Sequence, residues 1–337
     1  MTKAFIDRDG LHLNDEGIEK KLKWLTISAS LIEGMFECPA KFMFSKYLED
    51  EVIPAKPDSP LTRGTTFHRT LELYYGLDES KRPMSGIDMR ILSAAMRKAI
   101  SEAPEEVREN DIFLDWLKNA LNRYVRMDES AVNVKIANFT GKDGLTKPGL
   151  EMKVSGTIGN AKRKSFGMID RLIQANSDDP RSVIIDDYKT GRSAKPYDPR
   201  SRFSDFGYIR QQIMYAMLLE QDTGTYPNGF DVLGGRLIYP VADNADTASG
   251  KPGVILSVDV KNQKYRDKTV KDVEMAANMV NDAIAANTYG CNPSKICSWC
   301  PLANICPRAD RDEREKFVNA RASQPDELVL KPVIEKN

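Results

Sequence analysis

Three cysteines lie within ten residues near the end of the chain, and a fourth lies about 260 positions upstream. The close group is Cys297, Cys300 and Cys306, in a C-x2-C-x5-C array, and the distant residue is Cys38. Four soft ligands with this spacing suit a 4Fe–4S cluster or, alternatively, a structural zinc ion. Either centre would join the N- and C-terminal segments and close a very long loop. We expect the fifth cysteine, Cys291, to be a buried or free thiol outside the ligand set.

The residues enclosed between these cysteines include a second group with metal-binding chemistry. Asp170 lies on one expected strand, and Asp187 and Lys189 end the next strand after the apolar run 183–185. Side chains alternate along a strand, so Asp187 and Lys189 share a face. Two carboxylates can hold Mg²⁺ or Mn²⁺, and a neighbouring lysine can orient or deprotonate a water that attacks a phosphodiester.

An acid followed two positions later by a lysine is common in this chain, so the motif alone carries little weight. Five such triplets occur, at residues 19–21, 79–81, 151–153, 187–189 and 259–261. Only 187–189 both ends a β-branched run and follows a strand with an acid 17 residues earlier. The triplet that begins at Glu151 is the one serious rival, but no well-placed acid precedes it. A salt bridge between Asp187 and Lys189 is the structural alternative.

The chain has only two histidines, which can be weighed singly. His68 follows Gly64 at the start of an expected helix. With two candidate metal-binding aspartates downstream, we expect it to be a nitrogen ligand to Mn²⁺. His12 lies in a polar N-terminal segment, and we expect it at the surface.

Apolar periodicity predicts an α/β organisation in three parts. Residues 1–25 form a loose arm with a short strand, residues 26–308 form the main domain with a helical insertion at 77–130, and residues 309–337 form a charged tail. The expected helices are 28–36, 65–75, 87–103, 111–126, 206–222 and 271–287, and residues 42–48 are a further apolar-aromatic stretch. The expected strands are 131–139, 149–156, 166–175, 183–188, 230–241 and 253–260.

Composition limits the partners and the compartment. Lysine plus arginine equals aspartate plus glutamate at 49 each, so a surface for DNA must be local. The cluster 162–164 is either part of such a surface or a solvated turn. The sequence contains no run of 18 apolar residues and no signal-peptide core at its start, so we expect no membrane span. Five cysteines do not resemble a secreted disulfide framework, and we expect a bacterial or phage-infected host cytoplasm.

Four segments resemble, in order, the motifs of the PD-(D/E)XK superfamily, and specifically RecB-type nuclease domains together with CRISPR-associated and AddB-like iron–sulfur exonucleases. The segments are Gly64-x3-His68, Gly167-x2-Asp170-Arg171, Asp187-Tyr188-Lys189-Thr190-Gly191 and Gln211-x3-Tyr215. The segments around Cys38 and the C-terminal triplet resemble the first and last cysteine segments of these exonucleases. The resemblance therefore spans about residues 26–308.

The resemblance implies a PD-(D/E)XK nuclease core, in which helices flank a mixed central sheet and a cysteine-ligated cluster joins the two ends. It implies a metal site formed by His68, Asp170, Asp187 and the carbonyl of Tyr188, with Lys189 assisting the water. It implies cluster ligands at Cys38, Cys297, Cys300 and Cys306. Further residues are implied on the DNA side of the site or in positioning it, namely Arg171, Gln211 and Tyr215. Arg171 would brace the site or contact a phosphate, and helix packing is the alternative role for Tyr215.

Our leading hypothesis is an Mg²⁺- or Mn²⁺-dependent DNA exonuclease that acts on single strands or DNA ends in recombination, repair or replication. One alternative is a catalytically weak nuclease-fold subunit that binds DNA or assembles a larger complex. Another is a structural zinc protein whose carboxylates only form salt bridges. The sequence has no Walker-type run, so we expect any helicase partner to be a separate chain. Digestion polarity, strand preference, exo- versus endonuclease action and oligomeric state stay open.

Overall fold

The computed structural model describes residues 2–49, 57–83, 86–141, 143–198, 206–242, 251–309 and 330–332. The chain forms two compact units, each built from segments that are distant in sequence. We call residues 56–156 and 166–269 the sheet unit, and residues 1–55, 157–165 and 270–337 the cysteine unit. Within the described residues, no helix is both long and apolar enough to cross a membrane.

The sheet unit contains a five-stranded sheet in the order β5-β6-β7-β8-β9. Its strands are β5 (Leu150–Gly156), β6 (Ser165–Gln174), β7 (Ser182–Tyr188), β8 (Asp231–Tyr239) and β9 (Val254–Val258). The central strand β7 is antiparallel to β6 and parallel to β8, and β9 is antiparallel to β8. The sheet is therefore mixed, as predicted.

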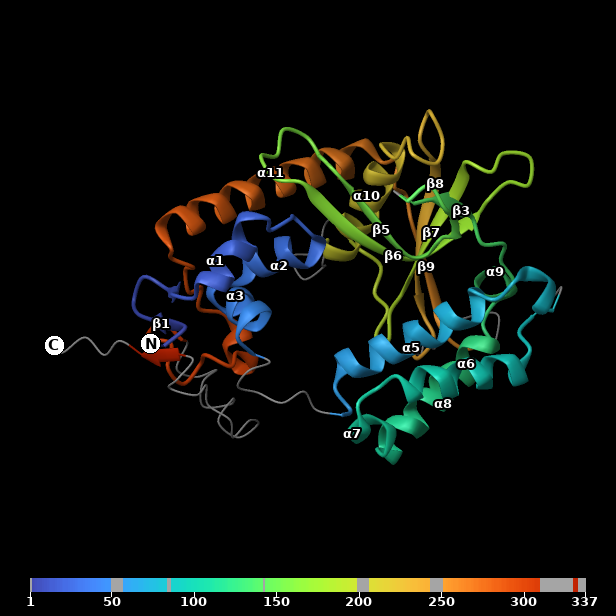
Figure 1. Ribbon diagram of the computed structural model, residues 1–337, viewed down its shortest axis with the longest axis horizontal. Coiled ribbons are helices and arrows are strands. Elements are labelled where there is room, and N and C mark those ends of the chain that lie inside the picture. The colour runs from blue at the N-terminus through green and yellow to red at the C-terminus, as the bar shows by residue number, and fades with distance from the viewer. Residues whose placement is uncertain are drawn as a thin grey trace. The chain divides into compact units, whose positions relative to one another are not determined.

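Helix α10 (Gly207–Glu220) connects the parallel strands β7 and β8, as such a crossover requires. It lies against β5, β7 and β8 (Figure 1). Glycines on the sheet permit its close approach. A Cβ at Gly167 would lie 2.4 Å from the ring of Tyr215, and one at Gly235 would lie 2.2 Å from Oε1 of Gln212. The sheet–helix spacing thus depends on two residues that have no side chain.

A group of helices packs on the other face of the sheet (Figure 1). They are α5 (Pro60–Tyr75), α6 (Met89–Ser101), α7 (Glu105–Arg108), α8 (Asp111–Val125) and α9 (Glu129–Val132), and the exposed 3-10 helix η1 (Glu79–Lys81) follows α5 in the chain. Phe67 of α5 and Leu117 of α8 share one buried apolar cluster with Ile173 of β6, Tyr188 of β7 and Ile238 of β8. This cluster fixes α5, and hence the position of its polar residues, against the sheet.

Arg171 is at the centre of a buried charge network and has no exposed surface. Its guanidinium donates to Asp186 at 2.6 and 2.9 Å, and it also donates to the Tyr124 hydroxyl at 2.9 Å. Arg236 donates to the same carboxylate at 2.6 and 2.8 Å. Arg171 therefore braces strands β6, β7 and β8 internally, and it has no surface with which to contact a phosphate.

The cysteine unit begins with a small sheet in the order β10-β1-β2. Its elements are β1 (Ala4–Ile6), β2 (Leu11–Leu13), α1 (Glu16–Lys23), α2 (Ala29–Glu37), α3 (Pro39–Tyr47), the part of α11 (Gln263–Ala286) from residue 270, η2 (Lys295–Trp299) and β10 (Leu330–Pro332). The expectation of a loose N-terminal arm was wrong, because apolar residues of β1 and β2 are fully buried. Most of the expected charged tail lies outside the described residues.

Two expectations about polar residues in this unit also change. His12 is largely buried rather than at the surface, since its ring stacks on Phe5 and Nδ1 lies 2.8 Å from the carbonyl of Asn287. In the cluster 162–164, Arg163 turns inward and donates to Asn281 at 2.6 Å and to the carbonyl of Leu25 at 2.8 Å. Arg163 thus holds its own unit together and does not contribute to a cationic surface.

The expected strand at 131–139 is confirmed only in its second half. Its first residues belong to α9, which Asp128 caps. Ile136 forms an antiparallel bridge with Ile173 of β6, and the short hairpin of β3 (Asn138–Thr140) and β4 (Thr146–Pro148) follows. Helix α5 begins five residues earlier than expected because Ser59 caps it and Pro60 fits its first turn. The helix expected at 271–287 begins at 263. The other expected strands and α10 are confirmed to within two residues.

The network predicts a large loss of stability for Asp186→Ala. The substitution removes the shared anion of two guanidinium groups, one of them fully buried, and we expect a loss of about 3–5 kcal/mol. Urea unfolding followed by circular dichroism measures it. The matched control is Asp231→Ala, which removes the acid of an exposed pair with Lys261 and should cost less than about 1 kcal/mol. Similar effects of the two substitutions would contradict the bracing role.

Candidate active site

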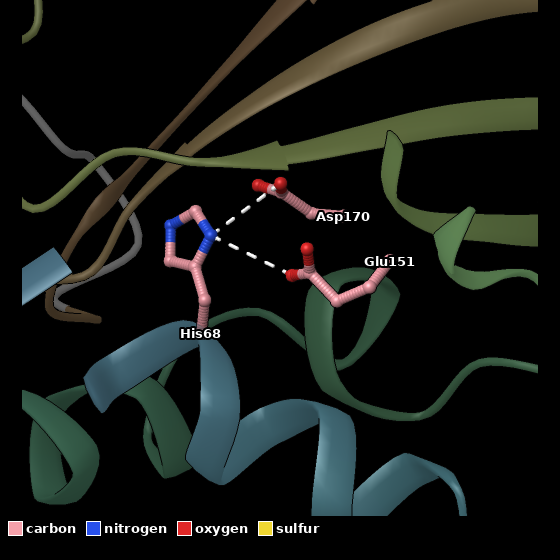
Figure 2. A group of neighbouring side chains, drawn as sticks. All are labelled: His68, Glu151 and Asp170. Atoms are coloured by element: carbon pink, nitrogen blue, oxygen red, sulfur yellow. Dashed lines mark ion pairs between the residues drawn. The ribbon is translucent and has the colours of Figure 1, made fainter. Parts of the chain in front are cut away.

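Three side chains from separate elements converge at one end of the sheet. Nδ1 of His68, on α5, lies 3.4 Å from Oδ1 of Asp170 on β6 and 3.8 Å from Oε1 of Glu151 on β5 (Figure 2). One ligand atom from each residue lies within 4.8 Å of the other two. Nε2 of His68 donates to the carbonyl of Tyr188 at 3.1 Å. Two of the predicted metal ligands are thus brought together, next to the predicted carbonyl.

A second chain of contacts leads from Asp187 to α10. Nζ of Lys189 lies 2.6 Å from Oδ2 of the buried Asp187 and donates to Oε1 of Gln211 at 3.0 Å. Nε2 of Gln211 donates in turn to the hydroxyl of Tyr215 at 2.8 Å. Gln211 and Tyr215, which were predicted to share one helix face, therefore position the Lys189 ammonium through hydrogen bonds. The buried Tyr215 also packs against Gly167.

Asp170 connects the two groups of residues. Its Oδ2 accepts the backbone N–H of Tyr188 at 2.7 Å, while its Oδ1 faces His68. One carboxylate thus fixes the end of β7 and also points to the imidazole. The residues predicted from the sequence as a metal site, His68, Asp170, Asp187 and Tyr188, form one continuous arrangement with Lys189.

Glu151 is the member of the site that the sequence analysis rejected. Its backbone has φ of +45°, a left-handed conformation that is uncommon for a residue with a side chain and is often found at functional sites. The rejected triplet 151–153 starts a strand that neighbours β6 in the sheet. A search for acids on adjacent strands, without a required order along the chain, would have retained it.

The electrostatics of the site favour a bound cation. Burial opposes charge on His68, but the charge of Asp170 and its hydrogen bond outweigh this and raise the pKa of His68 to about 9. Burial raises the pKa of Glu151 to about 7, and the charge of Asp170 adds to the effect. Burial also raises the pKa of Asp187 to about 6, although the ammonium of Lys189 opposes it. Each shift favours adding positive charge or a proton to a crowded anionic site.

The donor set fits a hard divalent cation. Three ionised carboxylates and one ammonium leave a net charge of −2 when His68 is neutral, which matches one divalent ion. Oδ2 of the buried Asp187 is paired with Nζ of Lys189, and this single ammonium offsets only part of the negative charge of the three carboxylates. Carboxylate oxygens with one imidazole suit Mg²⁺ or Mn²⁺ better than a soft metal.

All five cysteines line one small cavity in the cysteine unit. The sulfur of Cys38, at the junction of α2 and α3, accepts the N–H of Asn292 at 3.5 Å. Cys291 is buried, as expected, but it lies among the predicted ligands rather than apart from them. Its thiol is hydrogen-bonded with Cys306, which raises the pKa of Cys291 and lowers the pKa of Cys306 to about 7. Cys306 is thus the member of the pair that more readily forms a thiolate.

The spacing of these sulfurs differs from that of the carboxylate site. Among the described residues, the group His68, Glu151 and Asp170 is close enough to share a single ion, and the cysteines form no comparable group. The two groups of donors therefore differ in spacing as well as in chemistry.

The mixed sheet, the helices on both faces and the acidic site at the strand ends define a nuclease-type α/β fold. The chain matches the model of the PD-(D/E)XK nuclease superfamily over residues 26–307, and it belongs to that superfamily. This confirms the superfamily and the mixed α/β fold predicted from the sequence, whereas the cysteine-ligated cluster stays a prediction. A crystal structure from Eubacterium rectale named "Putative exonuclease" is similar, with a TM-score of 0.48 and 14% identity over 85% of this chain and 89% of that chain. No curated protein matches.

The geometry predicts that Glu151 contributes to cation binding. We expect Glu151→Gln, which keeps the side-chain volume but removes the charge, to weaken Mn²⁺ binding at least about tenfold, the scale seen for loss of an outer ligand partner. Isothermal titration of the protein without nucleic acid measures this. The control Asp231→Asn removes an exposed acid elsewhere on the sheet and should bind as the wild type does. Unchanged affinity in Glu151→Gln would exclude Glu151 from the site.

Proposed function

We propose that this protein is a metal-dependent deoxyribonuclease, an exonuclease that hydrolyses single-stranded DNA or DNA ends. The observation that carries the proposal is the convergence of Glu151, Asp170 and Asp187 with His68 and Lys189 in a chain of the nuclease superfamily. Phosphodiester hydrolysis needs an activated water and neutralisation of charge in the transition state. This arrangement supplies donors for a cation and a fixed positive charge side by side.

In the proposed mechanism, His68, Asp170, Asp187 and the Tyr188 carbonyl hold Mg²⁺ or Mn²⁺, and Glu151 completes the acidic surroundings. The bound ion would polarise the phosphate and lower the pKa of a water. His68 is suited to exchange its proton for the ion, because the same carboxylates that favour the proton favour the metal.

Lys189 acts in this mechanism as an ammonium. Burial lowers its pKa, but the charge of Asp187 outweighs burial, so the pKa of Lys189 is raised. A lysine that keeps its proton orients the attacking water and stabilises the developing charge on the phosphate. It does not act as the base that removes a proton from that water. Gln211 and Tyr215 position this ammonium through the hydrogen bonds at 3.0 and 2.8 Å.

We also propose that Cys38, Cys297, Cys300 and Cys306 hold a 4Fe–4S cluster, with structural zinc as the alternative. All five cysteines line one cavity, which supports a centre bound by several thiolates. Cys38 lies between two helices and the others lie in the segment after α11, so the cluster would staple distant parts of the cysteine unit. We propose roles in recombination, repair or replication, with any helicase as a separate partner.

Asp187→Ala tests the catalytic proposal. We expect the wild type to degrade end-labelled DNA with Mn²⁺ and to stop with EDTA, and Asp187→Ala to be at least about 100-fold slower, because metal binding supplies several kcal/mol of transition-state stabilisation. Asp231→Asn should keep full activity. Equal degradation by the wild type and Asp187→Ala, or no degradation by an anaerobically purified wild type, would contradict the proposal.

Substitution of single cysteines tests the cluster. Protein purified without oxygen should be brown and absorb near about 400 nm, as expected for an iron–sulfur centre. We expect Cys300→Ser to lose iron and colour, and Cys291→Ser to keep both, because Cys300 is in the proposed ligand set and Cys291 is outside it. Iron analysis and absorbance measure this. A colourless wild type that contains zinc would favour the alternative centre.

A further inference from the structure

A cavity in the sheet unit lies next to the candidate active site and has no role in the mechanism above. Its volume is about 460 Å³, which falls in the usual range for small-molecule sites. Residues 255–259, along the edge strand β9, form one side of it. The other walls include Lys195, Tyr197, Tyr208 and Tyr265.

Tyr208 connects this cavity to the candidate active site. Nζ of Lys189 lies 4.3 Å from the centre of the Tyr208 ring, a cation–π contact. Tyr208 precedes Gln211, the hydrogen-bond partner of Lys189, by three residues on α10, so both lie on the same side of the helix. The Tyr208 side chain is nevertheless 44% exposed. One ring thus touches the proposed catalytic ammonium and lines the cavity.

The composition of the walls favours a flat, uncharged group over a phosphate. The rings of Tyr197 and Tyr265 lie 5.7 Å apart, edge to face. Lys195 and Asp259 have opposite charges, so the cavity has no strong anion preference. Ser257 and Asn262 add a hydroxyl and an amide that can donate and accept hydrogen bonds. Aromatic walls with a few polar groups suit a nucleobase.

We propose that this cavity binds an unpaired base of the substrate strand, stacked on Tyr208, next to the phosphodiester held at the Lys189 site. The inference rests on the proposed nuclease function and names the form of its substrate. A base in a duplex must leave its stack to enter such a cavity, at a cost of a few kcal/mol. The site would therefore favour single strands and frayed ends over closed duplex.

Binding of an oligonucleotide tests the proposal without cleavage. The probe is a single-stranded oligonucleotide with 2-aminopurine near one end, and the parent protein is Asp187→Ala. Adding Tyr208→Ala should weaken binding by about 5- to 100-fold, the range for loss of one base–aromatic stack, and should abolish the quenching of 2-aminopurine fluorescence. Adding Tyr208→Phe, which keeps the ring, should change the Kd less than about twofold. Tyr226→Ala, an aromatic of the same unit outside the cavity, is the control.

Steady-state kinetics distinguish a Tyr208 ring that binds a base from one that only positions Lys189. If Tyr208 binds a base, Tyr208→Ala raises KM for single strands by a larger factor than KM for internally nicked duplex, and Tyr208→Phe restores the wild-type KM. If the ring only positions Lys189, kcat falls equally on both substrates, and that result would overturn the proposal. Unchanged Kd and quenching in Tyr208→Ala would also overturn it. A wild type that binds the probe but cleaves no DNA would instead refute the nuclease function alone.

Discussion

The antiparallel pairing of β6 with β7 is the constraint on which both faces of the sheet unit depend. This register sets Arg171 opposite Asp186. The same register, continued by one residue toward the end of β7, sets Asp170 opposite Asp187. Successive side chains face opposite sides of a sheet. Arg171 and Asp186 therefore face the helical core, whereas Asp170 and Asp187 face the candidate site. A single register therefore creates both the brace and the acidic site.

The two pairs have opposite energetic characters. Arg171 and Asp186 are fully buried, and Arg236 supplies further donors to the same carboxylate, so the cost of burying charge is offset by hydrogen bonds. Asp170 and Asp187 are like charges on neighbouring strands, an arrangement that costs stability. The fold holds the acids together with His68 and Lys189. Burial and then the charge of Asp170 raise the pKa of Asp187, and the charge of Asp170 outweighs burial in raising the pKa of His68. A divalent cation is the natural counter-charge for such a pair.

The sequence predicted the part of the site that follows from local pattern. Asp187 and Lys189 end a β-branched run, and Gln211 and Tyr215 are one helical turn apart, so strand and helix periods locate them. Glu151 was missed because its neighbour in space is set by the order of strands in the sheet and not by its order in the chain. His12 and Arg163 were misjudged for a related reason, since polar residues are buried when distant segments supply hydrogen-bond partners. Of the two roles given for Arg171, its burial leaves the brace.

The two candidate metal centres of this chain differ in the chemistry of their donors. One offers carboxylate oxygens and an imidazole, and the other offers sulfurs alone. Hard divalent ions bind thiolates poorly, whereas iron–sulfur centres need them, so ligand type directs each metal to its own site without mutual exclusion by shape. With the proposed metals, the anionic site would exchange its ion with the reaction conditions, while a thiolate-bound centre would stay in place.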